Sequence, residues 1–576
     1  MTKSALKALI LIFVQTIALT WAYELGFAQD LNVQVLSEQV REHLQNRIET
    51  EFVLPDTAIE DEYTYTTSML SRFYGRRNYL PAWISNDGPL TQVDALIKTI
   101  REANQEGLMP DEYNLGKIED KLREIRQRKD TNTPIDPFTL VILDILLTEA
   151  FLTYSSHLLD GRVNPEKIEA SWYPNRYEVD LVLLLQAALE SNTVEESLRS
   201  LLPVDQRYIR MRQALRRYRD IAARGGWNSV PDGPKIKKGD SGARIQALRA
   251  RFITEGYLVP GLSKNSEIFD DQLEQAISKY QDNHGLKVDG IVGRDTLASL
   301  NISVEERVRQ IELNMERLRW LPKDLGKRYV LINIPNYQLE VVENGKPVMI
   351  MRAVVGKPSD PSPVLSSEIT YLVLNPSWYV PSSIATSEIL KELRTDSTYL
   401  AKNDIKVYKV EDGTRREINP ATVNWTQVSE KNFNYKFRQR PGSKNVLGRI
   451  KFIFPNPFDV YLHDTSSPEL FAKFVRSFSH GCMRVEKPIE LAEFLMRDDP
   501  EWSRESILSA IDKRSEKTVW LPEPIPVNVV YLTAWVDENG SVQFRNDIYG
   551  LDKVLNEALN QRDKALSISK ESLNHE

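Results

Sequence analysis

The sequence contains one cysteine, Cys482, within the stretch SHGCMRVEKP that runs from Ser479 to Pro488. A thiol attacks a carbonyl carbon only as the thiolate, and a free cysteine, with a pKa of about 8.5, is mostly protonated at neutral pH. A reactive Cys482 would therefore need a base or a cation beside it. The alternatives for an unpaired cysteine are a buried inert thiol and an intermolecular disulfide.

Two of the six histidines are candidates for the base. His463 ends the strand-like segment DVYLHD, and a strand end can direct an imidazole across a neighbouring turn. His480 lies two residues before Cys482, and side chains two apart on an extended chain point to the same side. We favour His463 as the base and keep His480 as a candidate. The other histidines lie in predicted helical regions or in the C-terminal tail: His43, His157, His284 and His575.

The residues that flank Cys482 suit acyl chemistry. Gly481 permits backbone conformations that other residues avoid and lets a substrate approach closely. The backbone N–H groups from Gly481 to Met483 can bind a developing oxyanion, and removing one such donor from other enzymes costs about 3 to 4 kcal/mol. Arg484 adds a planar cation that can bind a carboxylate. The pattern favours a nucleophilic cysteine and implies a carboxylate-rich substrate.

The residue pattern changes from helical to strand-like at about residue 328. Two β-rich runs within 328–356 flank Glu343-Asn344-Gly345-Lys346, and Asn-Gly is a strong hairpin signal. A polar insertion at about 382–442 is predicted to form a capping subdomain. Further strands are predicted at 367–381, 448–456 and 459–464, helices at 488–497 and 503–512, and a last hairpin within 527–547 that joins the same sheet. The pattern predicts a mainly β catalytic domain over 328–548.

Helical patterns fill the sequence before this domain. Residues 29–234 have apolar residues at three- and four-residue spacing, which predicts a helical scaffold domain. Three short helices are predicted within 235–302, after a segment rich in glycine and proline. A charged helix makes 303–327 a linker, and 549–576 is assigned as a C-terminal tail. The predicted fold class is α+β with several domains.

The N-terminus has the layout of a cleaved secretory signal over residues 1–28. Lys3 and Lys7 precede an apolar run that ends at about residue 21, and the small residue Ala28 follows. The run is shorter than the roughly 20 residues that a spanning helix needs, which favours cleavage over a retained anchor. No other stretch is expected to cross a membrane. The net charge of −7 is mild and the basic residues are scattered, which argues against nucleic-acid binding.

The stretch HDTSSPELFAKFVRSFSHGCMRVEKP, from His463 to Pro488, resembles the L,D-transpeptidase signature of a histidine, a spacer, Ser-His-Gly-Cys and an arginine. The chain as a whole resembles the long periplasmic L,D-transpeptidases of Gram-negative bacteria, which have a YkuD-like catalytic domain. The segment 239–301 resembles the peptidoglycan-binding domain of many cell-wall enzymes. Further matching motifs are VGKP (355–358), NPSWYVPSSIA (375–385) and RQRPGSKNVLGRIKFIFPN (438–456).

This resemblance implies a role for each matching residue. Cys482 would be the nucleophile and His463 the base, with its imidazole held by a backbone carbonyl. Arg484 would orient the donor substrate. The remaining matches are the pocket-forming residues Ser479, His480 and Gly481 and the groove-lining aromatic residues Trp378 and Tyr379.

The resemblance also implies a reaction. A stem tetrapeptide of peptidoglycan would lose D-alanine and form a thioester, and the diaminopimelate amine of a second stem would attack it to give a 3-3 cross-link. Carbapenems would inhibit the enzyme, and no metal or other cofactor is implied. We expect a monomer in the periplasm, with other cell-wall synthases as candidate partners. A lipoprotein lysine and water remain open as alternative acceptors.

Two other functions also remain open. In a cysteine peptidase of the NlpC/P60 type the cysteine precedes the histidine, whereas His463 precedes Cys482 here. A non-enzymatic wall-binding protein would use the module at 235–302 and leave Cys482 without a catalytic role.

Overall fold

The computed structural model describes residues 37–50, 62–85, 88–131, 133–168, 172–173, 179–259, 261 and 266–572. The predicted signal at 1–28 and His575 lie outside these described residues. The chain divides into two compact units, which we describe separately. The first comprises Met1–Arg162, Tyr177–Pro203 and Ile568–Glu576, and the second Val163–Arg176 and Val204–Ser567.

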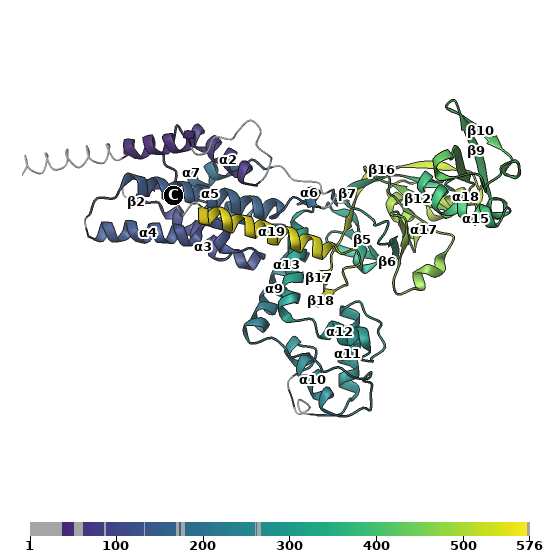
Figure 1. The fold of residues 1–576 in the computed structure, drawn as a ribbon, viewed down its shortest axis with the longest axis horizontal. Coiled ribbons are helices and arrows are strands. Elements are labelled where there is room, and N and C mark those ends of the chain that lie inside the picture. The colour runs from purple at the N-terminus through teal and green to yellow at the C-terminus, as the bar shows by residue number, and fades with distance from the viewer. Residues whose placement is uncertain are drawn as a thin grey trace, which may run out of the picture. The chain divides into compact units, whose positions relative to one another are not determined.

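The first unit is helical, as the sequence predicts. Its longest helix, α5 (Pro137–Asp160), begins after the N-cap residue Asp136, whose carboxylate accepts a hydrogen bond from the Phe138 backbone N–H. A shorter helix covers residues 37–50. The other main helices are α2 (Glu62–Arg76), α3 (Thr91–Arg101), α4 (Leu115–Asp130), α7 (Leu181–Glu190) and α8 (Val194–Arg199) (Figure 1).

By length and composition, helix α5 could cross a membrane. This differs from the sequence prediction, in which no stretch after the signal could do so. Most of the helix is buried inside the unit. Its buried Asp144 accepts hydrogen bonds from the backbone N–H groups of Ala82 and Trp83. The Tyr74 hydroxyl donates to the same carboxylate. A helix that is apolar on all sides is also what the centre of a helical core requires.

The second unit is built on one sheet of ten described strands. The order is β12-β13-β15-β6-β5-β4-β16-β7-β3; β14 pairs with β6, and β12 also pairs with β7, so the sheet closes on itself. The early strands are β3 (Trp172–Tyr173), β4 (Arg328–Asn333), β5 (Gln338–Glu343), β6 (Lys346–Gly356) and β7 (Val364–Leu374). The later strands are β12 (Ile450–Ile453), β13 (Leu462–His463), β14 (Ser477–Ser479), β15 (Met483–Val485) and β16 (Lys517–Val530).

Alternation along the strands gives this sheet a core face. Leu372, Phe452 and Leu462 are neighbours across β7, β12 and β13, and all three are buried. The β5–β6 hairpin turns at Asn344 and Gly345, whose positive φ angles of 50° and 75° suit the tight turn predicted from Asn-Gly. The predicted helices are also present and pack on this core: α17 (Pro488–Met496) and α18 (Arg504–Asp512).

The last predicted hairpin does not join this sheet, so that prediction is wrong. β17 (Ala534–Val536) and β18 (Val542–Phe544) form a separate two-stranded sheet. The chain leaves the large sheet near Thr533, whose backbone N–H donates to the Asn314 side-chain oxygen at 2.8 Å. The Asn314 amide in turn donates to the Thr533 hydroxyl. These residues are far apart in the sequence, so strand periodicity alone could not reveal this contact.

Two segments assigned as connections belong to packed structure. The predicted linker forms α13 (Val304–Arg319), which packs along α9 (Gln206–Ala223). The predicted C-terminal tail forms α19 (Leu551–Ser572). The leucines of α19 recur every four residues and so lie on one face, which joins the core of the large sheet: Leu551, Leu555 and Leu559.

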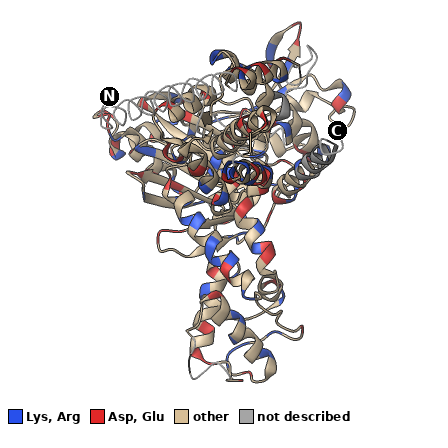
Figure 2. Cartoon of the chain, turned by 90° about the vertical axis from the view of Figure 1, so that its left-hand side faces the viewer, with Lys and Arg blue, Asp and Glu red and all other residues tan. Residues whose placement is uncertain are grey.

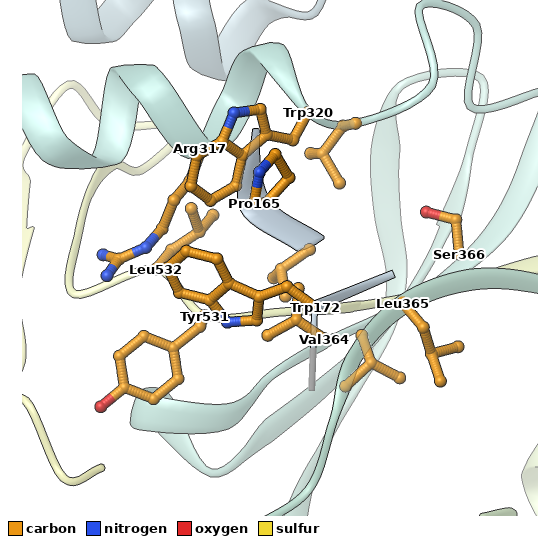
Figure 3. A pocket seen from close by; sticks show the side chains of 12 residues that line it. Pro165, Trp172, Arg317, Trp320, Val364, Leu365, Ser366, Tyr531 and Leu532 are labelled. Atoms are coloured by element: carbon orange, nitrogen blue, oxygen red, sulfur yellow. The ribbon is translucent and has the colours of Figure 1, made fainter. Parts of the chain in front are cut away.

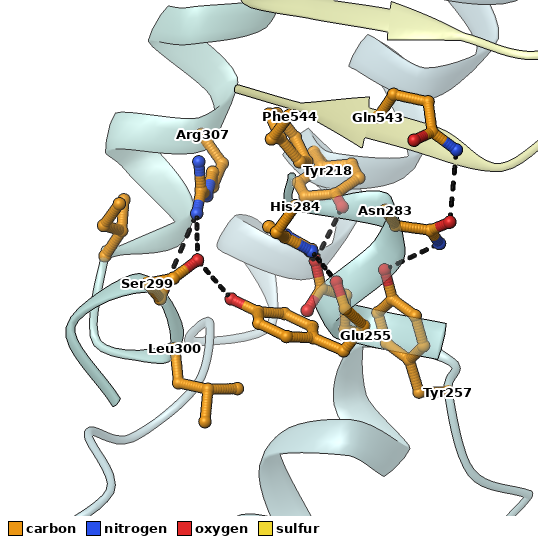
Figure 4. Close-up of polar contacts among 12 residues, drawn as sticks. Tyr218, Glu255, Tyr257, Asn283, His284, Ser299, Leu300, Arg307, Gln543 and Phe544 are labelled. Atoms are coloured by element: carbon orange, nitrogen blue, oxygen red, sulfur yellow. Dashed lines mark hydrogen bonds and ion pairs between the residues drawn. The ribbon is translucent and has the colours of Figure 1, made fainter. Parts of the chain in front are cut away.

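The predicted three-helix module within 235–302 has its own core. It contains α10 (Ala243–Glu255), α11 (Asp271–Asn283) and α12 (Arg294–Leu300). Figure 4 shows its contact with the β17–β18 hairpin, where the His284 ring stacks on Tyr280 and on Phe544 at centroid distances of 3.7 and 5.3 Å. The Gln543 amide also donates to Asn283 Oδ1 at 3.1 Å. The module is therefore fixed to the hairpin by buried side chains.

The insertion predicted at about 382–442 forms a subdomain with its own core. Its four-stranded sheet has the order β10-β9-β11-β8. The strands are β8 (Trp378–Tyr379), β9 (Ile405–Glu411), β10 (Thr414–Ile418) and β11 (Tyr435–Gln439), and a helical segment over Ala385–Ile389 continues into α15 (Leu390–Thr395).

Acidic and basic residues are interspersed along the whole chain (Figure 2).

A small apolar cavity lies where β3 meets the large sheet (Figure 3). The Trp172 ring packs against Trp320 at a centroid distance of 4.9 Å, and Tyr531 also lines the cavity. Trp172 pairs in parallel with Val364, the first residue of β7. A segment from the middle of the predicted scaffold domain thus supplies an edge strand of the large sheet.

Candidate active site

Two adjacent strands of the large sheet bring the predicted base close to the segment that carries the predicted nucleophile. His463 of β13 is the register partner of Arg484 of β15, and these strands run parallel. Register partners point to the same face, and so do residues two apart along a strand. Cys482 directly precedes β15 and packs partly against the core of the large sheet. The charges of Lys451 and Arg484 act on both Cys482 and His463, so the two side chains share charged neighbours.

His463 is buried, with 4% of its surface exposed. Its Nδ1 lies 2.5 Å from the backbone oxygen of Asp464, and because a carbonyl only accepts, Nδ1 must donate. This tautomer leaves Nε2 with a lone pair. Burial and the positive charge of Arg484 lower the pKa of His463 to about 3. The imidazole is therefore neutral at neutral pH and can accept a proton.

The Cys482 thiol is mostly buried, and burial raises its pKa above the ordinary value. Hydrogen bonds from Tyr461 and the positive charges of Lys451 and Arg484 lower the pKa of this thiol. With a raised thiol pKa and a lowered imidazole pKa, the resting pair is a neutral thiol and a neutral imidazole. The proton would then move when the sulfur attacks.

A set of hydrogen bonds fixes the turn before Cys482. Gly481 has a φ of 103°, a conformation that favours glycine. The Ser362 hydroxyl donates to the Gly481 carbonyl at 2.7 Å and accepts from the Gly356 N–H at 2.9 Å. The Ser479 hydroxyl, predicted to shape the pocket, donates to the Cys482 carbonyl.

The oxyanion donors differ from the sequence prediction at one position. The Met483 N–H donates to the backbone oxygen of Tyr461 at 3.2 Å, as part of the sheet. It is therefore engaged in the fold, and the candidate donors reduce to the N–H groups of Gly481 and Cys482.

His480, the alternative base, contacts residues away from His463. Its Nε2 lies 2.6 Å from Glu388 of the capping subdomain and 3.1 Å from Lys357 Nζ. Lys357 Nζ and Glu388 Oε1 are 3.9 Å apart. His480 therefore links the edge of the site to the capping subdomain.

Arg484 is mostly buried, and within the described part of the chain its Nε has no hydrogen-bond partner. Burial lowers its pKa, and the nearby charge of Glu469 raises it. A buried guanidinium with an unused donor can bind a carboxylate.

The two predicted groove residues, Trp378 and Tyr379, form β8 and pair with β11. Trp378 packs against the core of the capping subdomain. Tyr379 is 59% exposed, and the Arg438 guanidinium lies 5.3 Å from its ring centroid. Of the two aromatic residues, Tyr379 offers the larger surface to a ligand.

Two residues close to Cys482, Lys451 and Tyr461, are not among the residues predicted from the sequence. Lys451 of β12 is the register partner of His463, and its Nζ lies 3.7 Å from the Tyr461 ring centroid. Tyr461 hydrogen-bonds to Cys482. The alternation in DVYLHD puts Tyr461 on the His463 face, but the position of Lys451 depends on the pairing of two separate strands.

Comparisons with known proteins identify related domains along the chain. Three family descriptions match the chain: a scaffold domain at residues 68–215, a peptidoglycan-binding domain at 241–300 and an L,D-transpeptidase catalytic domain at 327–504. A Haemophilus influenzae protein named "Putative L,D-transpeptidase" is 30% identical over 298 residues, which is 50% of this chain and 59% of that protein. The chain thus spans about three fifths of that relative's length.

More distant similarities are also present. The amidase CwlM of Mycobacterium tuberculosis is 37% identical over 76 residues, 12% of this chain and 19% of that protein. A solved L,D-transpeptidase from Xylanimonas cellulosilytica is 15% identical, with a TM-score of 0.17, over 52% of this chain and 99% of that one. The TM-score is low, so the assignment rests on the family matches. The chain carries a YkuD-type L,D-transpeptidase catalytic domain, preceded by a peptidoglycan-binding domain.

Proposed function

We propose that the chain is a peptidoglycan L,D-transpeptidase that acts in the periplasm after removal of its signal segment. The observation that supports this function most strongly is that Cys482 and His463 share the charged neighbours Lys451 and Arg484, with His463 neutral and its Nδ1 held by a carbonyl. The peptidoglycan-binding domain ahead of it supports a cell-wall substrate.

In the first step, Cys482 attacks the carbonyl carbon of the third residue of a donor tetrapeptide, whose amide joins it to the terminal D-alanine. Nε2 of His463 takes the thiol proton as the carbon–sulfur bond forms. The N–H groups of Gly481 and Cys482 stabilise the oxyanion. The amide bond then breaks, His463 returns the proton to the leaving D-alanine, and a thioester remains. Arg484 binds a carboxylate of the donor.

In the second step, the side-chain amine of diaminopimelate on another stem attacks the thioester. His463 accepts the amine proton and returns it to the sulfur, so the enzyme regains its thiol and the product is a 3-3 cross-link. A carbapenem would acylate the same sulfur. The capping subdomain, joined to the site edge through Glu388 and His480, favours the amine over water by limiting solvent access.

Mass spectrometry of muropeptides tests this function. Purified protein should convert tetrapeptide-containing muropeptides into 3-3 dimers with loss of D-alanine, and Cys482→Ala should form none. Incubation with a carbapenem should also increase the intact mass of the wild-type protein by the mass of one carbapenem molecule. The mass of Cys482→Ala should not change. Equal cross-linking by both proteins would refute the assignment. Binding to cell walls without either product or adduct would favour a wall-binding protein.

A further inference from the structure

The face of the sheet that includes His463 also has an exposed aromatic pair. Trp520 of β16 is the register partner of Tyr371 of β7, and their ring centroids are 4.6 Å apart with an interplanar angle of 48°. Trp520 is 66% exposed, although Val519 and Leu521 on either side of it are buried in the core. This tryptophan contributes little to the interior of the domain.

Register connects the aromatic pair with Cys482. Tyr371 is the partner of Ile453 on β12. Phe452 is the partner of Leu462, so the next residues outward, Ile453 and Tyr461, also lie side by side. Leu462 is in turn the partner of Met483, which places Cys482 beside Tyr461. One row of side chains therefore crosses β16, β7 and β12 at Trp520, Tyr371 and Ile453. It continues to Tyr461 and Cys482, which directly precede β13 and β15 and hydrogen-bond to each other.

Strand spacing gives the length of this row. Neighbouring strands lie about 4.8 Å apart, so Tyr371 lies roughly 14 Å and Trp520 roughly 19 Å from Cys482 along the sheet. An extended peptide spans about 3.3 to 3.6 Å per residue, so three residues span about 11 Å. The scissile carbonyl of the proposed donor belongs to its third residue. The peptide alone would therefore end roughly 3 Å before Tyr371 and roughly 8 Å before Trp520, and the linking group and the sugar ring attached to it would cover this remaining distance.

The chemistry of the pair suits a sugar ring. A sugar has apolar C–H faces and a rim of hydroxyl groups, so an aromatic ring can cover the face while the hydroxyls stay in water. Tryptophan and tyrosine are large and rigid, and each also has a polar group that can hydrogen-bond. Thr518, exposed in the neighbouring row of β16, adds a further hydroxyl on this face.

We propose that Tyr371 and Trp520 bind a sugar ring of the glycan chain to which the donor stem peptide is attached. This inference rests on the proposed function, because it places the stem peptide between the aromatic pair and Cys482. The enzyme would then recognise the donor at both ends, through Arg484 near the sulfur and through the aromatic pair near the sugar.

The test compares two donors, a disaccharide tetrapeptide and the same tetrapeptide without sugar. Trp520→Ala should raise KM for the disaccharide donor by roughly three- to tenfold, as expected for one lost aromatic contact. Its kcat/KM for the sugar-free donor should stay at the wild-type value. Trp520→Phe should recover most of the affinity, and Val348→Ala, another exposed apolar position, should change neither donor.

If Trp520→Ala raises KM equally for both donors, or for neither, the proposal is wrong. Binding measured in a Cys482→Ala background separates it from the proposed function, because this assay needs no turnover. Calorimetry should show weaker binding of the disaccharide tetrapeptide when Trp520→Ala is added. If that difference is seen although the wild-type protein forms no cross-links, the glycan contact stands and the transpeptidase assignment fails. If binding is unchanged, the glycan contact is wrong.

Discussion

His463 and Arg484 are register partners on adjacent parallel strands, and the guanidinium helps to keep the imidazole neutral. The same cation also lowers the pKa of the Cys482 thiol against the effect of burial. One charge therefore adjusts both members of the pair: it favours a base that can accept a proton and a sulfur that can release one.

Replacing Arg484 should change the reactivity of Cys482. In Arg484→Met the thiol loses a nearby cation, so its pKa should rise by roughly half to one unit. The rate of alkylation of Cys482 by iodoacetamide, followed by mass spectrometry from pH 6 to 10, should shift to higher pH by that amount. Arg415→Met, at an exposed position on β10, is the control and should leave the profile unchanged. An unshifted profile in Arg484→Met would contradict the electrostatic role.

Lys451 should have a similar but separable effect. Its charge lowers the pKa of Cys482, and its ammonium lies over the Tyr461 ring. Lys451→Met should shift the same alkylation profile to higher pH, while Lys451→Arg, which keeps the charge, should shift it less. Equal shifts in both variants would mean that Lys451 acts through packing and not through its charge.

Acid should destabilise the catalytic domain through His463. Its pKa is about 3 in the folded protein and 6.5 as the ordinary value. Between these values the unfolded chain binds a proton that the folded chain does not, so stability falls as pH decreases from 6.5 towards 3. The melting temperature of His463→Gln should therefore decrease less between pH 7 and pH 4.5 than that of the wild type. Parallel decreases would show that other groups, such as the buried His284, dominate.

Gly448 should tolerate no side chain. Its φ is 61°, and a Cβ atom there would lie 2.4 Å from the Asp464 carboxyl carbon. Gly448→Ala should displace Asp464, whose backbone carbonyl holds His463, and reduce both stability and kcat. Gly345→Ala is a matched control, because its φ of 75° is similar and nothing lies within 4 Å. The free energy of unfolding of the control should fall by about 1 to 2 kcal/mol, and its activity should stay at the wild-type level. Equal unfolding free energies for the two variants would refute the steric argument.

Ser362 should matter for the turn before Cys482. Ser362→Ala leaves the Gly481 carbonyl and the Gly356 N–H without their shared partner, which costs about 1 to 3 kcal/mol at a buried site. We expect a lower kcat, measured on muropeptides, with KM nearly unchanged. Ser359→Ala, on the same loop but exposed, is the control. A wild-type kcat in Ser362→Ala would show that the turn keeps its geometry without this hydroxyl.

Much of the local structure can be predicted from the sequence. Asn344-Gly345 marks the β5–β6 turn, and the helices of the module follow from their apolar spacing. The proximity of Cys482 and Arg484 also follows from their two-residue spacing. These features depend on neighbouring residues, whose backbone preferences are sufficient to indicate them.

The remaining features depend on contacts between distant segments. Lys451 reaches the site only because β12 pairs with β13, and Trp520 joins the Cys482 row only through β7 and β12. The β17–β18 hairpin departs from the sheet because Asn314 binds Thr533. Periodicity gives the buried face of a strand, but it does not give the neighbour of that strand.

Strand β16 lies between β4 and β7 in the middle of the sheet, although it is the last strand of that sheet to be synthesised. A nascent chain that already contains Cys482 and His463 still lacks the strand that separates β4 from β7. Non-local pairings of this kind form slowly. Until residues 517–530 are present, the polypeptide would expose two unsatisfied strand edges, so chaperone protection would be needed late in its folding, and C-terminal truncations should aggregate without residual activity.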